Sequence, residues 1–187
     1  MKKVISLLMV AMLAIFMVGC DSDDNGTQSQ IDVADSQELL QKVWDNYADD
    51  EKFAVIGGDA DNNNMEGPGK FSVEDGEALD VTLGFPADSA AKIDDAASLI
   101  HMMNANTFTC GAFRVVEGED MAALNDEIKE NIKNRQWMCG FPDELVIVNA
   151  GNYVISFFGA SDLVDGFQAN LLEVYPQAEV VAEESLM

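Results

Sequence analysis

The sequence predicts an α+β domain in which helices pack against a mainly antiparallel sheet of about four strands. Two apolar runs on either side of Asn-Ala-Gly-Asn, at residues 149–152, form the strongest hairpin pattern in the chain. A second pair of strand-like runs flanks the polar residues 104–106. Amphipathic helical periods lie before, between and after these pairs. Strand pairs combined with separate helices indicate the α+β class.

The N-terminal half is expected to begin with a helix. Asp35 and Glu38 have the spacing of a capping box, and the apolar stripe that follows ends near Asp49. A short helix further on is expected to end at Gly84. The remaining segments are expected to be, in order, a strand or buried loop at 53–58, a polar loop at 59–69, that short helix at 73–83, and a helical turn at 87–93.

The C-terminal half is expected to contain both strand pairs, each followed by a helix. For the long helix that starts near Glu117, Gly140 suits the C-terminal cap and Pro142 prevents continuation. Ser161 or Asp162 is expected to cap the last helix. The strands are expected at 97–103, at 107–116, and in the hairpin 144–159.

The first twenty residues indicate export and attachment to a membrane. Two lysines precede an apolar run that is shorter than the ~20 residues a bilayer span needs. The run ends Phe16-Met17-Val18-Gly19-Cys20, which resembles the bacterial lipobox, whose cysteine receives a diacylglycerol. We therefore expect a signal peptide at 1–19, a lipid on Cys20, and a location at the extracytoplasmic face of the cell membrane. The alternative is an ordinary signal peptide with an incidental cysteine.

The chain after the signal peptide is expected to divide into three parts. Residues 20–34 contain Cys20 and an acidic, polar stretch without periodicity, which is typical of a flexible tether. Residues 35–176 are long enough for a single domain with its own core. Residues 177–187 are acidic and are expected to form a frayed tail.

The charge of the protein excludes one class of partner. The full chain has 10 basic and 34 acidic residues, a net charge of −24, and loss of 1–19 removes two lysines to leave 8 against 34, or −26. Phosphate backbones and anionic lipid headgroups repel such a surface, so no nucleic-acid partner is expected. The acidity serves solubility, or it attracts cations or cationic partners.

The order of elements, read with three stretches of sequence, resembles a known family. The stretches are LIHMMNANTFTCGAFRV, DMAALNDEIKENIKNRQ and VIVNAGNYVISFF, within a segment from about Leu83 to Tyr175. This segment is similar to the bacterial family called domain of unknown function 4358. The resemblance implies a cell-envelope lipoprotein of this fold and implies no known activity. The insert DADNNNMEGPGK and the two mature cysteines depart from the family pattern.

Those two cysteines, Cys110 and Cys139, allow two interpretations. An exported domain can keep a disulfide, and closing this loop of about 30 residues stabilises by about 3.5 kcal/mol in the chain-entropy model. Two buried reduced thiols are the other interpretation, because the sequence does not supply the separation between the residues.

No arrangement of residues in the sequence indicates catalysis or a cofactor. His101 is the only histidine and lies in a strand-like run, where a structural role is expected. One histidine and two scattered cysteines give no zinc-ligand spacing, so no metal site is expected. Five methionines are interpreted as core-filling side chains, namely Met65, Met102, Met103, Met121 and Met138.

One stretch partly matches a calcium-binding loop. Asp59, Asp61 and Asn63 occupy the first three ligand positions, but Asn64 and Lys70 stand where glycine and a bidentate glutamate are needed. The stretch is interpreted as an exposed loop with at most millimolar calcium affinity. An unchanged melting temperature in excess calcium would contradict even this weak binding.

These observations favour a lipid-anchored, non-enzymatic interaction module that binds a protein or another envelope component. The alternative is a small-molecule or cation-binding lipoprotein, such as a transport accessory. A third hypothesis is an enzyme that uses only carboxylates, which requires two facing carboxylates at glycosidase spacing.

Overall fold

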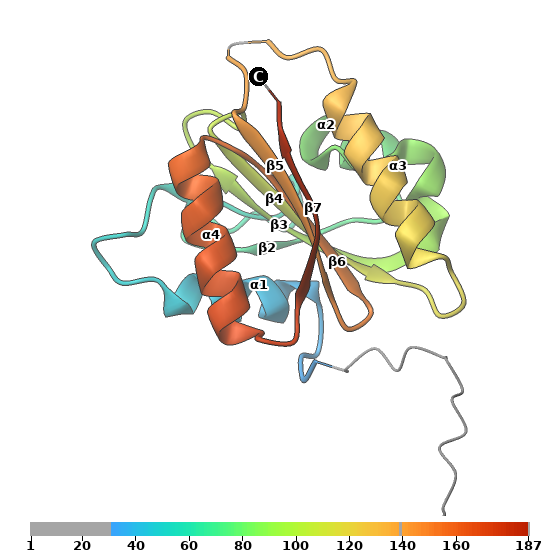
Figure 1. Ribbon diagram of the computed structural model, residues 1–187, viewed down its shortest axis with the longest axis horizontal. Helices are drawn as coiled ribbons and strands as arrows, with labels where there is room; N and C mark the ends of the chain where they lie inside the picture. Colours follow the sequence, from blue (N-terminus) through green and yellow to red (C-terminus); the bar gives the residue numbers. More distant parts are fainter. Residues whose placement is uncertain (1–30, 139, 187) are drawn as a thin grey trace, which may run out of the picture.

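The computed structural model describes residues 31–138 and 140–186, which form one sheet with helices on both faces (Figure 1). The strands are β1 (Val55–Ile56), β2 (Gly69–Phe71), β3 (Ile93–His101), β4 (Phe108–Val115), β5 (Glu144–Ala150), β6 (Tyr153–Gly159) and β7 (Glu179–Ser185). The helices are α1 (Ser36–Asn46), α2 (Gly76–Leu83), α3 (Met121–Lys133) and α4 (Ser161–Val174), and a 3₁₀ turn, η1, spans Ala87–Lys92. The predicted signal peptide, Cys20 and the tether up to residue 30 lie outside the described residues.

All strand pairs in this sheet are antiparallel, in the order β1-β3-β4-β6-β5-β7, and β2 pairs with β3 beside β1. The α+β class and the antiparallel sheet are therefore confirmed. The predicted size of the sheet is wrong, because the described residues form seven strands rather than about four. The three strands beyond the four expected are β1, β2 and β7, of which β1 lies within 53–58, where a strand or a buried loop was expected. Two of them are only two or three residues long, so they leave almost no periodic pattern in the sequence.

The C-terminal segment differs most from the expectation. Residues 177–187 are not a frayed tail, since 179–185 form β7 and pair with β5 from Asn149↔Glu179 to Glu144↔Ser185. Burial alternates along β7 between partly buried and exposed positions. An edge strand buried on alternate residues keeps its polar side chains, which explains why this segment resembles a tail. The folded domain thus extends beyond residue 176.

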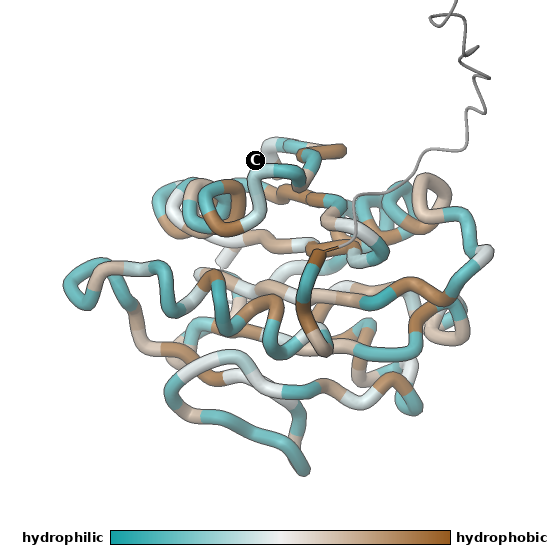
Figure 2. Tube along the Cα trace, turned by 90° about the horizontal axis from the view of Figure 1, so that it is seen from below, coloured by the Kyte–Doolittle hydropathy of each residue, from teal (hydrophilic) through white to brown (hydrophobic). Residues whose placement is uncertain are grey.

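Two apolar layers hold the helices to the sheet. One joins α1 and α4 to a face of the sheet, and the other joins α2 and α3 to the opposite face (Figure 1). Strands β4, β5 and β6 are buried almost throughout because both of their faces are covered. Figure 2 shows the same arrangement: hydrophobic residues run through the middle of the molecule, and the projecting loops are mainly hydrophilic.

The predicted helix caps are partly confirmed. The side chain of Asp35 accepts the N–H of Glu38 at 2.9 Å, as in a capping box, whereas the Glu38 carboxylate accepts the N–H of Ala34 at 2.7 Å in place of that of Asp35. Gly84 ends α2 in the left-handed region with φ 73°. Helix α3, however, ends at Lys133 rather than near Gly140. The cap of α4 is Ala160, not Ser161 or Asp162, and the N–H of Ser161 instead donates to the carboxylate of Asp143 at 3.2 Å. A contact with a distant residue therefore takes part in the start of α4.

The described chain begins at one end of the strands. The N–H of Ser36 donates to the carboxylate of Asp95 near the start of β3 at 2.6 Å, and Arg114 near the end of β4 donates to the carbonyl of Ala34 at 3.4 Å. The β3–β4 loop lies at the other end of these strands, roughly 30 Å away for a strand of nine residues. In Figure 1 the start of α1 is at the bottom and the α3–β5 loop is at the top.

Candidate functional site

Exposed apolar side chains gather at the end of the sheet that lies opposite the start of the domain. Seven large apolar side chains are exposed among the described residues, and four of them lie in two neighbouring loops. Met102 and Met103 belong to the β3–β4 loop, and Met138 and Phe141 belong to the α3–β5 loop. Met103 and Met138 are 81% and 80% exposed, so these side chains do not fill the core. We call these four residues the apolar end.

Hydrogen bonds fix the two loops of the apolar end to each other. The side-chain amide of Asn106 donates to the carbonyl oxygens of Met138, at 2.7 Å, and Gly140, at 2.9 Å. Within the first loop, the hydroxyl of Thr109 donates to the carbonyl of Ala105 at 2.9 Å. Because these bonds hold the backbone, the apolar side chains are presented on a defined surface and are not part of a floppy segment.

Aromatic packing joins the α3–β5 loop to the sheet. The ring of Trp137 packs edge-on against Phe158 of β6, with ring centroids 5.2 Å apart. The guanidinium of Arg135 lies 5.2 Å from the centre of the Trp137 ring and donates to the carbonyl of Val81 at 2.5 Å. Burial lowers the pKa of Arg135, and the negative charge of Asp80 partly opposes this shift. Arg135 thus brings a half-buried positive charge to this part of the surface.

The two loops of the apolar end contain a single acid, Asp143 in the last position before β5, although the chain contains 34 acids. Residues 96–113 contain no Asp, Glu, Lys or Arg, and in residues 134–142 Arg135 is the only charged residue. The centres of protein–protein interfaces are depleted of charge and enriched in methionine, aromatic residues and arginine. The composition of the apolar end therefore matches an interface in an otherwise strongly acidic protein.

The structure contradicts the interpretation of the methionines as core-filling side chains. Four of the five are exposed, and Met121 is partly buried against the α2–α3 layer. Sequence reasoning missed the apolar end because exposure depends on where β3 and α3 stop. The acid-free run 96–113 was the available signal.

A separate groove of about 890 Å³ lies between the 58–63 loop, β2 and α2. Its apolar lining includes Ile56, Phe71 and Ile100, and its carboxylates are Asp59, Asp61, Glu74 and Asp75. This groove contains all three residues that match a calcium loop, Asp59, Asp61 and Asn63.

In that groove, Asp59 binds the protein itself. One carboxylate oxygen accepts the N–H groups of Asp61 and Asn62, at 3.0 and 2.9 Å, and the other accepts the N–H of Ser72 at 2.7 Å. Burial alone raises the pKa of Asp59, but these hydrogen bonds outweigh it and bring the pKa below the ordinary value. Within 31–138 and 140–186, no three His, Cys, Asp or Glu side chains are grouped to hold a metal ion.

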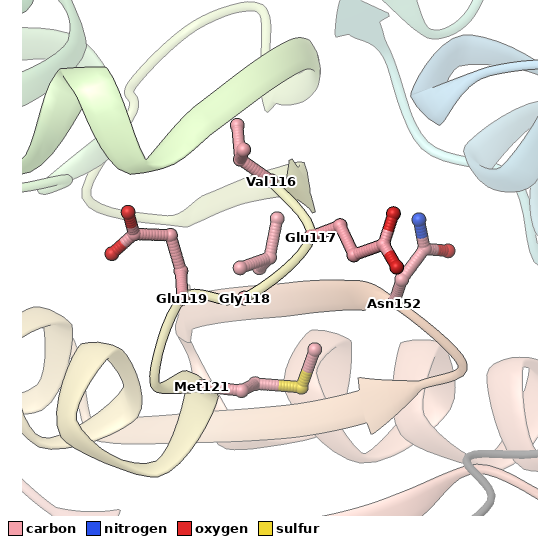
Figure 3. A pocket seen from close by; sticks show the side chains of 7 residues that line it. Val116, Glu117, Gly118, Glu119, Met121 and Asn152 are labelled. Carbon is pink, nitrogen blue, oxygen red and sulfur yellow. The ribbon is translucent and has the colours of Figure 1, made fainter.

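A hollow of about 400 Å³ lies at the end of the sheet opposite the apolar end, between the β4–α3 loop and the β5–β6 turn. Figure 3 shows that its two carboxylates do not face each other, because Glu117 points toward Asn152 and Glu119 points to the opposite side. This arrangement does not match the facing pair that glycoside hydrolysis needs.

His101 has the structural role expected of it. Its ring stacks on Phe53 with centroids 5.9 Å apart and 17° between the planes. Its Nδ1 accepts the N–H of Met103 at 3.3 Å, which helps to shape the β3–β4 loop.

The cysteines are tested only in part. Cys110 lies fully buried in β4 and has no disulfide partner among the described residues, and burial raises the pKa of its thiol well above the ordinary value. Such a thiol is a poor nucleophile. Cys139 and Cys20 lie outside the described residues, so the Cys110–Cys139 disulfide and the lipid on Cys20 stay predictions.

Comparisons with known proteins bring no relative to this chain: no family model, no curated protein and no solved structure matches it. The resemblance to domain of unknown function 4358 therefore stays a prediction. Among the described residues, no helix is long and apolar enough to cross a membrane.

Proposed function

We propose that this chain is a lipid-anchored protein of the extracytoplasmic membrane face and a non-enzymatic interaction module, which binds an envelope protein through the apolar end. The exposed apolar surface, whose two loops contain one acid in a protein of net charge −24, is the observation that carries this proposal. An exposed apolar cluster costs solubility, and clusters of this kind mark interaction sites.

The position of the apolar end suits a partner that lies away from the anchor. A lipid on Cys20 would hold the chain through the tether, which joins the domain beside Asp95 and Arg114. Met103 lies at the opposite end of the same strands. The apolar end therefore lies at the end of these strands opposite to the point where the tether joins the domain.

The rigidity of the apolar end favours binding. Association costs free energy for every side chain and loop that must become ordered. Here the backbone of both loops is already held by Asn106, so less ordering remains to be done. A second copy of the chain is a poor occupant, because two such acidic molecules repel each other.

A photo-crosslinking amino acid in place of Met103, in the full-length chain in intact membranes, tests the proposal. Met65 is the matched control position, since it is an exposed methionine in a different loop. We expect one recurrent protein to be cross-linked from position 103 and not from position 65. Equal products from both positions, or none, would contradict the proposal, and a product of two copies would show self-association instead.

Charge substitution gives a second test in the same membranes. The Met103→Glu and Met138→Glu double variant places two acids in the apolar end, where we expect complex formation to fall at least tenfold, a cost of about 1.4 kcal/mol. Met65→Glu is the control and should leave the complex unchanged. Both side chains of the double variant are exposed, so its melting temperature should stay at the wild-type value.

A further inference from the structure

A tyrosine at the end of α1 has a buried hydroxyl without a partner. Tyr47 is 6% exposed, and its ring packs on Trp44 and Phe53. Its hydroxyl makes no hydrogen bond to any described residue. The two other tyrosines differ, because Tyr175 donates to the carbonyl of Leu39 at 3.2 Å and Tyr153 is hydrogen-bonded to Arg114. A buried hydroxyl that lacks a partner is destabilising, and a ligand that supplies a hydrogen bond at this point would offset that cost.

A hollow of about 370 Å³ opens onto Tyr47 between the end of α1 and α4. Its lining residues are Tyr47, Glu51, Asp162, Leu163, Gly166, Ala169 and Asn170. The volume is at the lower limit of ordinary small-ligand pockets, which measure about 300–1,000 Å³.

Gly166 leaves room directly beside the hydroxyl. It lies inside α4, where glycine is less favourable than alanine. A Cβ at this position would lie 3.9 Å from the Tyr47 hydroxyl oxygen, which is an ordinary contact. Packing therefore does not demand glycine here, and its effect is to leave the space beside the hydroxyl open.

The charges around the hollow select a cation. Glu51 and Asp162 line it, and no lysine or arginine does. The amide of Asn170 is already used, since it donates to the carbonyl of Gly166 and accepts from Asn46, both at 2.9 Å. Burial raises the pKa of Tyr47, so its side chain stays a neutral hydroxyl that can accept a hydrogen bond.

We propose that this hollow binds a small organic ammonium ion, with an N–H donated to the Tyr47 hydroxyl and the positive charge facing Glu51 and Asp162. Leu163 and Ala169 contact the apolar part of the ion. The site is independent of the apolar end and stands whether or not a protein binds there.

Titration of the full-length chain in detergent with n-butylammonium chloride tests this site, with n-butanol as the uncharged probe of the same length. Tyrosine-ring NMR signals report binding, and Tyr153 and Tyr175 serve as internal controls. We expect a saturable shift of the Tyr47 signal alone, and only with the ammonium ion. Equal binding of n-butanol would contradict the selectivity for a cation. A Tyr47 signal that does not move would contradict ligand binding in this hollow, and a water molecule would then be the partner of the hydroxyl.

Two variants separate binding from folding. Tyr47→Phe should weaken binding about tenfold, since a hydrogen bond to a charged group is lost, while Tyr175→Phe should leave the affinity unchanged. Gly166→Ala should abolish binding yet raise the melting temperature, because its methyl group takes the space beside the Tyr47 hydroxyl and alanine favours the helix. Retained binding in Gly166→Ala would also overturn the site, even if Tyr47→Phe fails to fold.

Discussion

The side-chain amide of Asn106 donates to the carbonyl oxygen of Met138 at 2.7 Å, across 32 positions of sequence. A second bond from the same amide reaches Gly140. One side chain therefore sets the position of the α3–β5 loop against the β3–β4 loop, and with it the geometry of the apolar end.

Asn106→Ala should release the α3–β5 loop without unfolding the domain. The two lost hydrogen bonds are exposed, so we expect a loss of about 1 kcal/mol in the free energy of unfolding. Chymotrypsin should then cleave faster after Trp137, which limited proteolysis measures. The control is Asn62→Ala, which removes the hydrogen bond from the side-chain amide of Asn62 to the carboxylate of Asp59 in another loop. Equal cleavage in the two variants would show that Asn106 does not hold the loop.

The local signals in the sequence were sufficient for the central elements of the fold. The hairpin of β5 and β6, the long helix and the Asp35 cap all follow from patterns within a few residues. Strand β7 did not, because Val180 and Ala182 pack on opposite layers only after β5 is in place. Burial that depends on a partner distant in sequence leaves no complete pattern in the segment itself.

The candidate sites were harder to predict than the fold, for the same physical reason. Met103 and a core methionine look alike in sequence, and only the end of β3 places Met103 in solvent. The Tyr47 hollow likewise needs α1 and α4 side by side. The calcium-like spacing at Asp59 was visible, but the hydrogen bonds that occupy its carboxylate were not.

Asp35→Ala should destabilise the protein more than Asp75→Ala. Both aspartates cap a helix, through the N–H of Glu38 and of Ala78, and loss of a cap costs about 1 kcal/mol. Asp35 also forms an ion pair with Lys70 of β2 at 2.9 Å, which adds a few tenths of a kcal/mol at this partly exposed site. Urea denaturation of both variants measures the difference. A larger loss from Asp75→Ala would contradict the role of the ion pair.

The contact between Glu127 and Lys92 should make stability depend on pH. Lys92 donates to both carboxylate oxygens at 2.7 and 2.6 Å, and the hydroxyl of Ser89 donates at 2.6 Å. These hydrogen bonds lower the pKa of Glu127 below its ordinary value of 4.5, and the hydrogen bond from Lys92 has the largest effect. The unfolded chain therefore takes up the proton at a higher pH than the folded one. The stabilisation is complete above the ordinary pKa and is lost as pH falls through the folded value.

In the Glu127→Gln variant, the free energy of unfolding should therefore decrease less steeply between neutral pH and about pH 3 than in the wild type. The carboxylate is 39% exposed, so solvent screening limits the effect to below about 1 kcal/mol. Lys92→Met should flatten the same region, because it removes the first of the two donors. Urea denaturation at several pH values measures the slope, and a slope in Glu127→Gln equal to that of the wild type would count against the contact.

Deletion of residues 177–187 should cause unfolding or aggregation, because it removes β7. Strand β5 is buried at Leu145, Val146, Ile147 and Val148, and β7 pairs with it along nearly its whole length. Without β7, the backbone N–H and C=O groups of an apolar strand become a free edge, which is a template for pairing between molecules. The natural edge is protected, since β7 carries Glu179, Glu183 and Glu184.

Size-exclusion chromatography and circular dichroism of the shortened chain measure this effect. Val181→Ser is the control, because it changes an exposed residue of β7 and keeps the backbone pairing. We expect the control to be folded and monomeric, and the shortened chain to elute as aggregate or to melt many degrees lower. A shortened chain with the wild-type melting temperature would mean that β5 needs no neighbour and that the acidic segment is a tail after all.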